Sequence, residues 1–174
     1  VGNRGVILKT IDGGANWTLC ATPSDANLLA VSFFDANYGL AVGGRVASTT
    51  RGGQGVVLRT IDGGTTWGLV ETAAFPILRD VRIIDPENAW IAGDSSTMYP
   101  LGLFVSVDTG VTWDAVAGAR HDGWRAIMYD PVERLGAGVT TSGDAQTLDG
   151  DAITQPTLSL GIRRLADVCY DGSV

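Results

Sequence analysis

The sequence predicts an all-β fold assembled from repeated modules of short antiparallel strands. Three observations lead to this prediction: few helix-forming residues, a turn motif that recurs at regular intervals, and a core-strand pattern that recurs in step with it. With 24 glycines, three glutamates and one lysine among 174 residues, the chain is rich in turn formers and poor in helix formers. Its hydrophobic content of 45% is enough for a packed core at this length.

The charge balance excludes some partners. Nineteen acidic residues against twelve basic ones give a formal net charge of −7, and no basic stripe appears, so we do not expect nucleic acid to bind. No apolar run reaches the roughly 18 residues of a membrane-spanning helix. The two cysteines, Cys20 and Cys169, are too sparse for a disulfide framework and leave the compartment open.

A turn motif of the form Ser/Thr-x-Asp-x-Gly-x-x-Trp, here called the box, occurs three times. Its aspartate advances by 50 and then by 46 residues, and a fourth, degenerate copy is expected around Asp149, with Asp151 in the glycine place and Thr154 in the tryptophan place. The defining residues are Thr10, Asp12, Gly14 and Trp17 in the first box, Thr60, Asp62, Gly64 and Trp67 in the second, and Ser106, Asp108, Gly110 and Trp113 in the third.

Between the boxes runs a core-strand pattern with the same spacing. A short apolar strand that ends in glycine follows each of its first three copies, at 39–43, 89–93 and 134–138. The pattern is formed by Leu28, Val31 and Phe33, then Leu78, Val81 and Ile83, then Trp124, Ile127 and Tyr129, then Leu165, Val168 and Tyr170.

Each module therefore has four strands, A to D: the core strand, the glycine-ended strand, the strand that enters the box, and the strand that leaves it. Four short strands in roughly 45 residues are typical of one blade of a β-propeller. The sequence predicts a single β-propeller domain or portion over 1–174, of four-stranded antiparallel blades. About four modules are expected, at approximately 1–21, 28–71, 78–116 and 124–158, with the start of the next at 165–174.

We expect a portion of a larger propeller, because Val1-Gly2 matches the end of a strand B and 165–170 matches a strand A. The alternative is a minimal ring in which the strand at 165–170 completes a blade with the first strands C and D. Four blades are the lower limit of the roughly four to eight that propellers have.

The box residues have local structural tasks. An aspartate can accept hydrogen bonds from backbone N–H groups two residues on, glycine permits positive φ, and a Ser or Thr hydroxyl can join the same network. The tryptophans are expected to fill the gap beside each hairpin. We expect no catalytic role for the boxes, and we expect Asp62→Ala to leave buried amides unpaired.

These motifs resemble the Asp-box, or BNR, repeat of sialidases, xyloglucanases, sortilin-type receptors and photosystem II assembly factors. The segments 28–35, 39–43 and 55–67 are most similar to the photosystem II stability and assembly factor family. This resemblance implies a non-enzymatic propeller without a cofactor that binds protein partners, including a membrane-associated complex. It also implies a location outside the cytoplasm.

Five residues are candidates for partner binding. Arg79 and Arg125 occupy the same place in successive core strands and could bind a carboxylate, or they could instead pair with neighbouring aspartates such as Asp80 and Asp85. The other candidates lie in the long connections 44–54 and 94–102, because loops of unequal length on a rigid scaffold often carry specificity. They are Arg45, Arg51 and Tyr99.

The alternative function is an Asp-box glycoside hydrolase or carbohydrate-binding propeller, similar to sialidases or xyloglucanases, with its active site partly outside this chain. Such a site would be a pocket at the propeller axis lined by Arg, Tyr and Glu, whereas the three glutamates fall in expected loops or turns. The single histidine, His121, argues against a histidine metal site or a histidine-based triad, and no metal is expected.

Overall fold

The computed structural model describes residues 1–46, 53–70, 75–100, 102–116, 122–130, 135–142, 144–149 and 152–158. Within these ranges the chain is all-β, with a 3-10 turn, η1 (Asn3–Gly5), and no α-helix. None of the described helices has the length and apolar character required to cross a bilayer. Arg51, His121, Cys169 and the segment 165–174 lie outside the described residues.

The strands form one two-stranded and three four-stranded antiparallel sheets, each following chain order. This confirms the prediction of an all-β chain with four-stranded antiparallel modules. The first sheet contains β1 (Ile7–Lys9) and β2 (Thr18–Cys20), and the second contains β3 (Asn27–Phe33), β4 (Gly39–Arg45), β5 (Gln54–Thr60) and β6 (Gly68–Leu69). The third contains β7 (Leu78–Ile83), β8 (Ala89–Gly93), β9 (Leu103–Ser106) and β10 (Asp114–Ala115), and the fourth contains β11 (Trp124–Asp130), β12 (Leu135–Thr140), β13 (Ala145–Asp149) and β14 (Ala152–Leu158).

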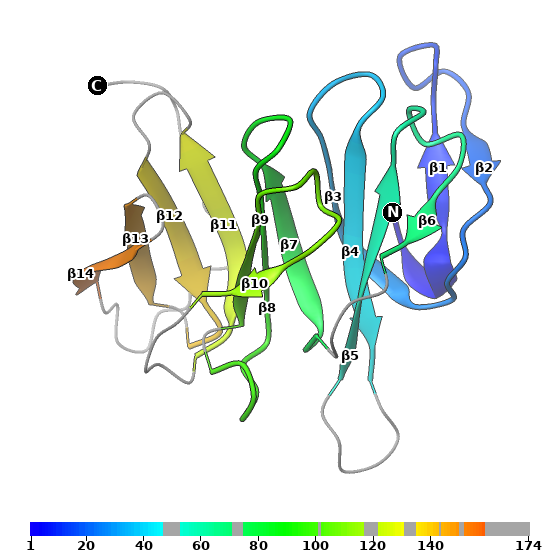
Figure 1. Ribbon diagram of the computed structural model, residues 1–174. Coiled ribbons are helices and arrows are strands. Elements are labelled where there is room, and N and C mark those ends of the chain that lie inside the picture. The colour runs from blue at the N-terminus through cyan, green and yellow to red at the C-terminus, as the bar shows by residue number, and fades with distance from the viewer. Residues whose placement is uncertain are drawn as a thin grey trace.

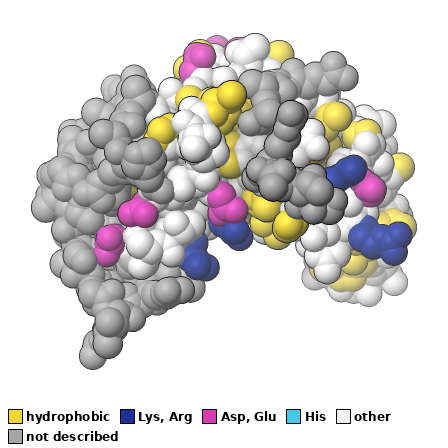
Figure 2. All heavy atoms as spheres, turned by 90° about the horizontal axis from the view of Figure 1, so that it is seen from below, with side chains coloured by type: hydrophobic (Ala, Val, Ile, Leu, Met, Phe, Trp, Pro, Cys, Tyr) yellow, Lys and Arg dark blue, Asp and Glu magenta, His cyan; other side chains and the backbone are white. Residues whose placement is uncertain are grey.

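The four sheets follow one another across the molecule, from β1 and β2 on one side to β11–β14 on the other (Figure 1). The first strands of the four-stranded sheets are neighbours, since β7 contacts both β3 and β11. Seen from below, the molecule is an arc with one hollowed side (Figure 2). Side chains of both charges lie along the inner edge of this arc.

Apolar side chains fill the spaces between neighbouring sheets. Leu40 and Val42 of β4 pack against Leu78, Val81 and Ile91 of the third sheet. Since β4 and β8 are covered on both faces, their apolar sequences are almost entirely buried, as expected for strands inside a stack of sheets.

Glycine closes these second strands because the backbones come close there. A Cβ atom at Gly43 would collide with the carbonyl oxygen of Asn27, and one at Gly93 would collide with that of Ile77. Any side chain at these positions would push the first strand of the sheet away.

In the fourth sheet, β13 and β14 pair as a hairpin where the degenerate box is expected. Asp149 is the last residue of β13, and β14 begins at Ala152. The hairpin therefore has the place of the C–D hairpins in the other sheets.

Candidate functional site

Each box turn is organised around a hydroxyl group. In the second box, Thr60 Oγ1 accepts hydrogen bonds from the backbone N–H groups of Gly64, at 2.8 Å, and Asp62, at 3.3 Å. The same hydroxyl donates to Asp62 Oδ1 at 2.8 Å, and this carboxylate accepts bonds from the backbone and side chain of Thr66. Thr10 with Asp12, and Ser106 with Asp108, repeat this arrangement.

The prediction that Asp62 pairs with buried amides is wrong. The buried N–H of this turn belongs to Gly64, and its acceptor is the Thr60 hydroxyl, whereas the bonds from Thr66 to Asp62 are exposed. Hydrogen bonds from the Thr66 side chain and backbone lower the pKa of Asp62 to about 2, and those from Asn16 do the same for Asp12. These carboxylates are therefore ionised hydrogen-bond acceptors within the turns.

The box tryptophans differ in exposure. Trp67 is 7% exposed and packs in the core between the first and second sheets, whereas Trp17 is 59% exposed. The prediction that the ring fills a gap therefore fails for Trp17, although its Nε1 donates a hydrogen bond to the carbonyl of Gly14 as expected for a closed turn.

A β-bulge occurs at the same place in each first strand of the three complete sheets. The pairing register shifts between Leu28 and Ala30, between Leu78 and Asp80, and between Trp124 and Ala126. The residues within the shifts are Leu29, Arg79 and Arg125, here called the bulge row. A bulge redirects the side chain of its extra residue, so the row places three equivalent side chains on neighbouring strands.

Arg79 forms an ion pair, but with neither of the aspartates that the sequence suggests. Its Nε and Nη2 donate to the two carboxylate oxygens of Asp94, at 2.5 and 3.0 Å, in the bidentate geometry that fixes a guanidinium plane. Both side chains remain partly exposed. Arg125 is exposed and has no hydrogen bond or ion pair among the described residues.

Asp80 instead connects two sheets. Its carboxylate is buried and accepts hydrogen bonds from the backbone N–H groups of Val81, at 2.9 Å, and Ile127, at 2.8 Å. Arg82 Nε donates to the carbonyl oxygen of Ile127 at 2.8 Å. Both the N–H and the C=O of Ile127 are therefore bound by side chains of β7. These bonds tie β7 to β11.

The loop candidates are engaged in structural contacts. Arg45 forms an ion pair with Asp25. The Tyr99 ring packs edge-on against Phe104 with centroids 5.0 Å apart, and its backbone N–H donates to Ser96. Arg45 is the last residue of β4, and the partner-binding role expected for Arg45 and Tyr99 stays a prediction.

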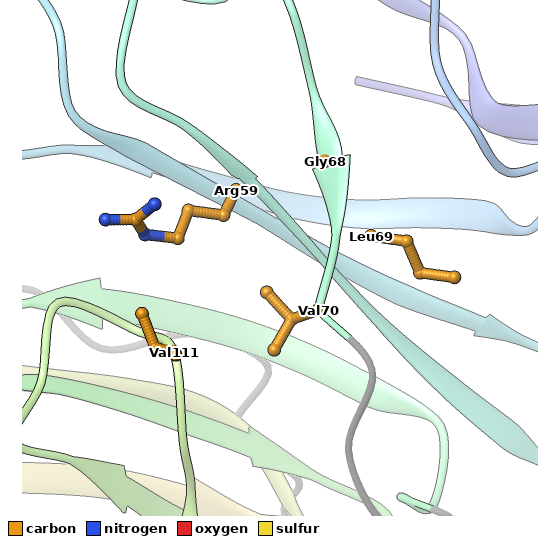
Figure 3. A pocket seen from close by; sticks show the side chains of 5 residues that line it. All are labelled: Arg59, Gly68, Leu69, Val70 and Val111. Carbon is orange, nitrogen blue, oxygen red and sulfur yellow. The ribbon is translucent and has the colours of Figure 1, made fainter.

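A pocket of about 300 Å³ lies between the second and third sheets, lined by Arg59, Gly68, Leu69, Val70 and Val111 (Figure 3). Arg59 Nε donates to the carbonyl of Thr109 at 2.7 Å, and its guanidinium lies 5.6 Å from the centroid of the Tyr38 ring. Burial raises the pKa of Tyr38 to about 12. Among the described residues that line this pocket, Arg59 is a cation, the others are aliphatic residues or glycine, and none carries a carboxylate.

Sequence reasoning missed Arg59, Arg82 and Asp94. A signal for Arg59 was present, because a cation precedes the box hydroxyl residue in two copies, as Lys9 and Arg59. The contact of Arg82 depends on which sheet lies alongside, and that of Asp94 depends on how β7 pairs with β8. Within the described ranges, no group of three or more metal-ligating side chains comes together.

Neither a protein-family model nor a curated protein sequence matches this chain. Among solved structures, YCF48 bound to D1 peptide is similar with a TM-score of 0.69 and 20% identity over 99% of this chain. An ancestral GH74 enzyme has a TM-score of 0.69 and 16% identity over 94%, and the Niastella koreensis GH74 enzyme has 0.56 and 14% over 90%.

The chain spans 53% of the YCF48 chain and 24% and 30% of the two enzyme chains, so it corresponds to part of each. These neighbours have the β-propeller fold, and they include a protein bound to a peptide as well as enzymes. This protein therefore shares the fold of β-propellers, and its described residues form three four-stranded sheets and one two-stranded sheet.

Proposed function

We propose that this chain is a non-enzymatic protein-binding module that holds an extended acidic segment of a partner along the bulge row. The observation that carries the proposal is the repetition of one bulge at one register, which places Leu29, Arg79 and Arg125 on the neighbouring strands β3, β7 and β11. Guanidinium groups are suited to carboxylates because their donors match the two oxygens.

The two arginines differ in how many of their N–H donors are left for a ligand. Asp94 holds Nε and Nη2 of Arg79, which orients the guanidinium and leaves its Nη1 for a ligand. The exposed Arg125 has no partner among the described residues and keeps its full donor set. Leu29 is also exposed, so the row presents one apolar contact beside two cations.

A peptide-bound propeller among similar structures supports this class of function. By the same reasoning, and from the sequence resemblance, we propose a location outside the cytoplasm and a partner within a membrane-associated complex. The whole chain has a formal net charge of −7, so an acidic segment must be attracted locally, by the two arginines of the row.

The test is binding of a fluorescein-labelled octapeptide that carries two aspartates and one leucine, compared with its asparagine counterpart. We expect salt-sensitive binding of the aspartate peptide and a loss of about tenfold in Arg125→Gln, because charge-assisted hydrogen bonds to a carboxylate are lost. Lys9→Gln is the matched control, since Lys9 precedes the first box and lies beside Gly63 of the second, at the opposite end of the sheets from the row. Equal affinity for both peptides would refute the proposal.

The second candidate is a hydrolase or carbohydrate-binding propeller, which the two similar GH74 enzymes favour. Among the described residues, neither the cavity lined by Arg59 nor the one lined by Trp17 and Trp67 brings Arg, Tyr and Glu together. The carboxylates near the bulge row, Asp80 and Asp94, already accept hydrogen bonds. Incubation with xyloglucan should therefore release no reducing ends, and their steady release by the purified chain would favour the enzyme.

A further inference from the structure

The second residue of each box is a branched aliphatic residue that the turn does not use. In the second box, the hydroxyl of Thr60 and the carboxylate of Asp62 form the hydrogen bonds that close the turn, and the side chain between them takes no part. The three boxes and the expected fourth copy have Ile11, Ile61, Val107 and Leu148 at this place. Turn chemistry therefore does not explain why an aliphatic side chain recurs here.

In the second and third boxes these side chains face solvent. Ile61 is 63% exposed and Val107 is 65% exposed, and Val111 of the third box is a further aliphatic residue with 51% exposure. Both sheets pack against a described sheet on either side, and the box residues remain exposed nonetheless. Single exposed apolar residues are ordinary on a protein surface, whereas a contiguous group of them is typical of a binding surface.

The second and third boxes form one continuous surface with the neighbouring A–B turns. Arg59 Nε donates to the carbonyl oxygen of Thr109 at 2.7 Å, which joins the strand that enters the second box to the third box. Within each sheet, the residue after the box aspartate donates its backbone N–H to a carbonyl of the A–B turn, at 2.8 Å for Gly63 and 2.9 Å for Thr109. All four turns lie at the same end of their sheets (Figure 1). This surface, here called the box edge, comprises 34–38, 60–67, 84–88 and 106–113.

The box edge is acidic. Hydrogen bonds from the backbone of Tyr38 and Asn37 lower the pKa of Asp35, so this carboxylate is ionised at neutral pH, as is that of Asp62. The four turns contain no lysine or arginine, and their carboxylates belong to Asp35, Asp62, Asp85, Glu87 and Asp108. An apolar group surrounded by negative charge attracts a partner that is both apolar and cationic.

We propose that the box edge binds a short basic segment of a partner protein, in which Lys or Arg residues flank aliphatic ones. The aliphatic side chains would cover Ile61 and Val107, and the flanking cations would lie near the carboxylates of the four turns. An anionic lipid surface would be repelled by these carboxylates. The box edge lies at the opposite end of the sheets from the bulge row and has the opposite charge, so the two sites are independent.

The probe is a fluorescein-labelled octapeptide that carries two valines flanked by lysines, added to the whole chain. It should bind saturably and more weakly at high salt, because salt screens its attraction to the exposed carboxylates. A peptide with serines in place of the valines should bind about tenfold more weakly, because it buries less apolar surface. A peptide with glutamates in place of the lysines should not bind.

The test variant is Ile61→Ser combined with Val107→Ser, which removes both exposed aliphatic side chains and keeps the residues that close the turns. We expect affinity for the lysine–valine peptide to fall about tenfold. The matched control is Met98→Ser, which should bind as the unmodified chain does. Met98 is 71% exposed and lies in the B–C connection, at the opposite end of the third sheet.

The charge of the box edge is tested separately. Glu87 is exposed, and among the described residues its side chain forms no ion pair, so Glu87→Gln removes a charge without opening a turn. This variant should bind the lysine–valine peptide more weakly and with a smaller dependence on salt.

Three results would overturn the proposal: no saturable binding, equal binding of the valine and serine peptides, or unchanged affinity in the double variant. Self-association of the free chain, or its binding to neutral lipid vesicles, would also overturn it if the double variant abolishes the association and the peptide does not compete with it. Arg125→Gln should leave binding of the lysine–valine peptide unchanged, and the double variant should still bind the aspartate peptide. Failure here is therefore distinguishable from failure of the acidic-segment proposal.

Discussion

At the residue scale, the box hydroxyl and the box aspartate have different tasks. Thr60 is buried and serves as the acceptor for the buried N–H of Gly64, whereas Asp62 is exposed and accepts bonds from its own turn. The larger energetic cost should therefore follow loss of the hydroxyl. Replacing the threonine by valine keeps the shape of the side chain and removes the hydroxyl. It therefore separates the contribution of the hydrogen bond from that of packing.

We expect Thr60→Val to lower the free energy of unfolding by roughly 1–3 kcal/mol, because it leaves a buried N–H without an acceptor. Urea denaturation followed by tryptophan fluorescence measures the change. Thr10→Val is the matched control: its Gly14 is only partly buried, so water can replace the lost bond and the effect should be smaller. Equal losses in the two variants would contradict this account.

The box carboxylates lead us to expect that the folded state loses stability in acid. Hydrogen bonds lower the folded-state pKa of Asp12 and Asp62 from 3.8 to about 2. A lowered pKa stabilises the folded state above the unfolded pKa, and this contribution is lost as pH falls through the folded pKa. Stability should therefore decrease between about pH 4 and pH 2.

Asp62→Asn should make the loss of stability at acidic pH smaller, because the asparagine side chain does not titrate. Unfolding free energies measured by urea denaturation at a series of acidic pH values test the expectation. A slope that is unchanged in the variant would show that other groups cause the acid sensitivity.

At the element scale, strands β7 and β11 are joined by polar bonds as well as by packing. The Asp80 carboxylate and the Arg82 guanidinium together hold the N–H and C=O groups of Ile127. Because Asp80 is buried, its removal would leave amides of both strands without an acceptor.

We expect Asp80→Ala to cost roughly 1.5–3 kcal/mol, the range for hydrogen bonds to charged groups. Hydrogen exchange of the Ile127 amide should also accelerate relative to the amides of β4, which lies outside this contact. Asp85→Ala is the control, since Asp85 accepts bonds within its own A–B turn and should leave Ile127 exchange unchanged. Unchanged exchange in Asp80→Ala would contradict the role assigned to it.

At the scale of the whole molecule, stability should vary along the arc. Among the described residues, the first sheet has two strands and several exposed apolar side chains, whereas the second and third sheets have four strands each. Two-stranded sheets are marginally stable alone, and local opening follows the local density of buried contacts.

Native-state hydrogen exchange should therefore show faster exchange in β1 and β2 than in β4, β5 and β8. Peptide-resolved mass spectrometry after deuterium labelling measures this directly. Uniform protection across the blades would mean that the arc opens as one cooperative unit.

Much of the fold was predictable because the same local sequence signals recur in each module. The box at 60–67 closes its turn with bonds among residues two to four apart, and the alternation in Leu78, Val81 and Ile83 marks a first strand. Such signals require no knowledge of the neighbouring blade. The same locality explains why Arg79 and Arg125 were recognised as equivalent positions.

The candidate site was predictable only in part. The register identified Arg79 and Arg125, but the bulge that sets them apart arises from pairing with β8 and β12. The partner of Arg79 is Asp94, 15 residues away across that pairing, and neither Asp80 nor Asp85 fills this place. A sequence pattern cannot rank three nearby aspartates without the geometry of the strand pair.

By itself, the sequence determined the all-β class, the four-strand module and the place of each box, because these depend on turn chemistry and on apolar periodicity within roughly 45 residues. Tertiary structure alone decided which equivalent residues are covered. Val31 and Val81 share a register and an identity, yet one is exposed and the other buried, because burial depends on the blade that lies alongside. It likewise decided that Trp17 is exposed and Trp67 is buried.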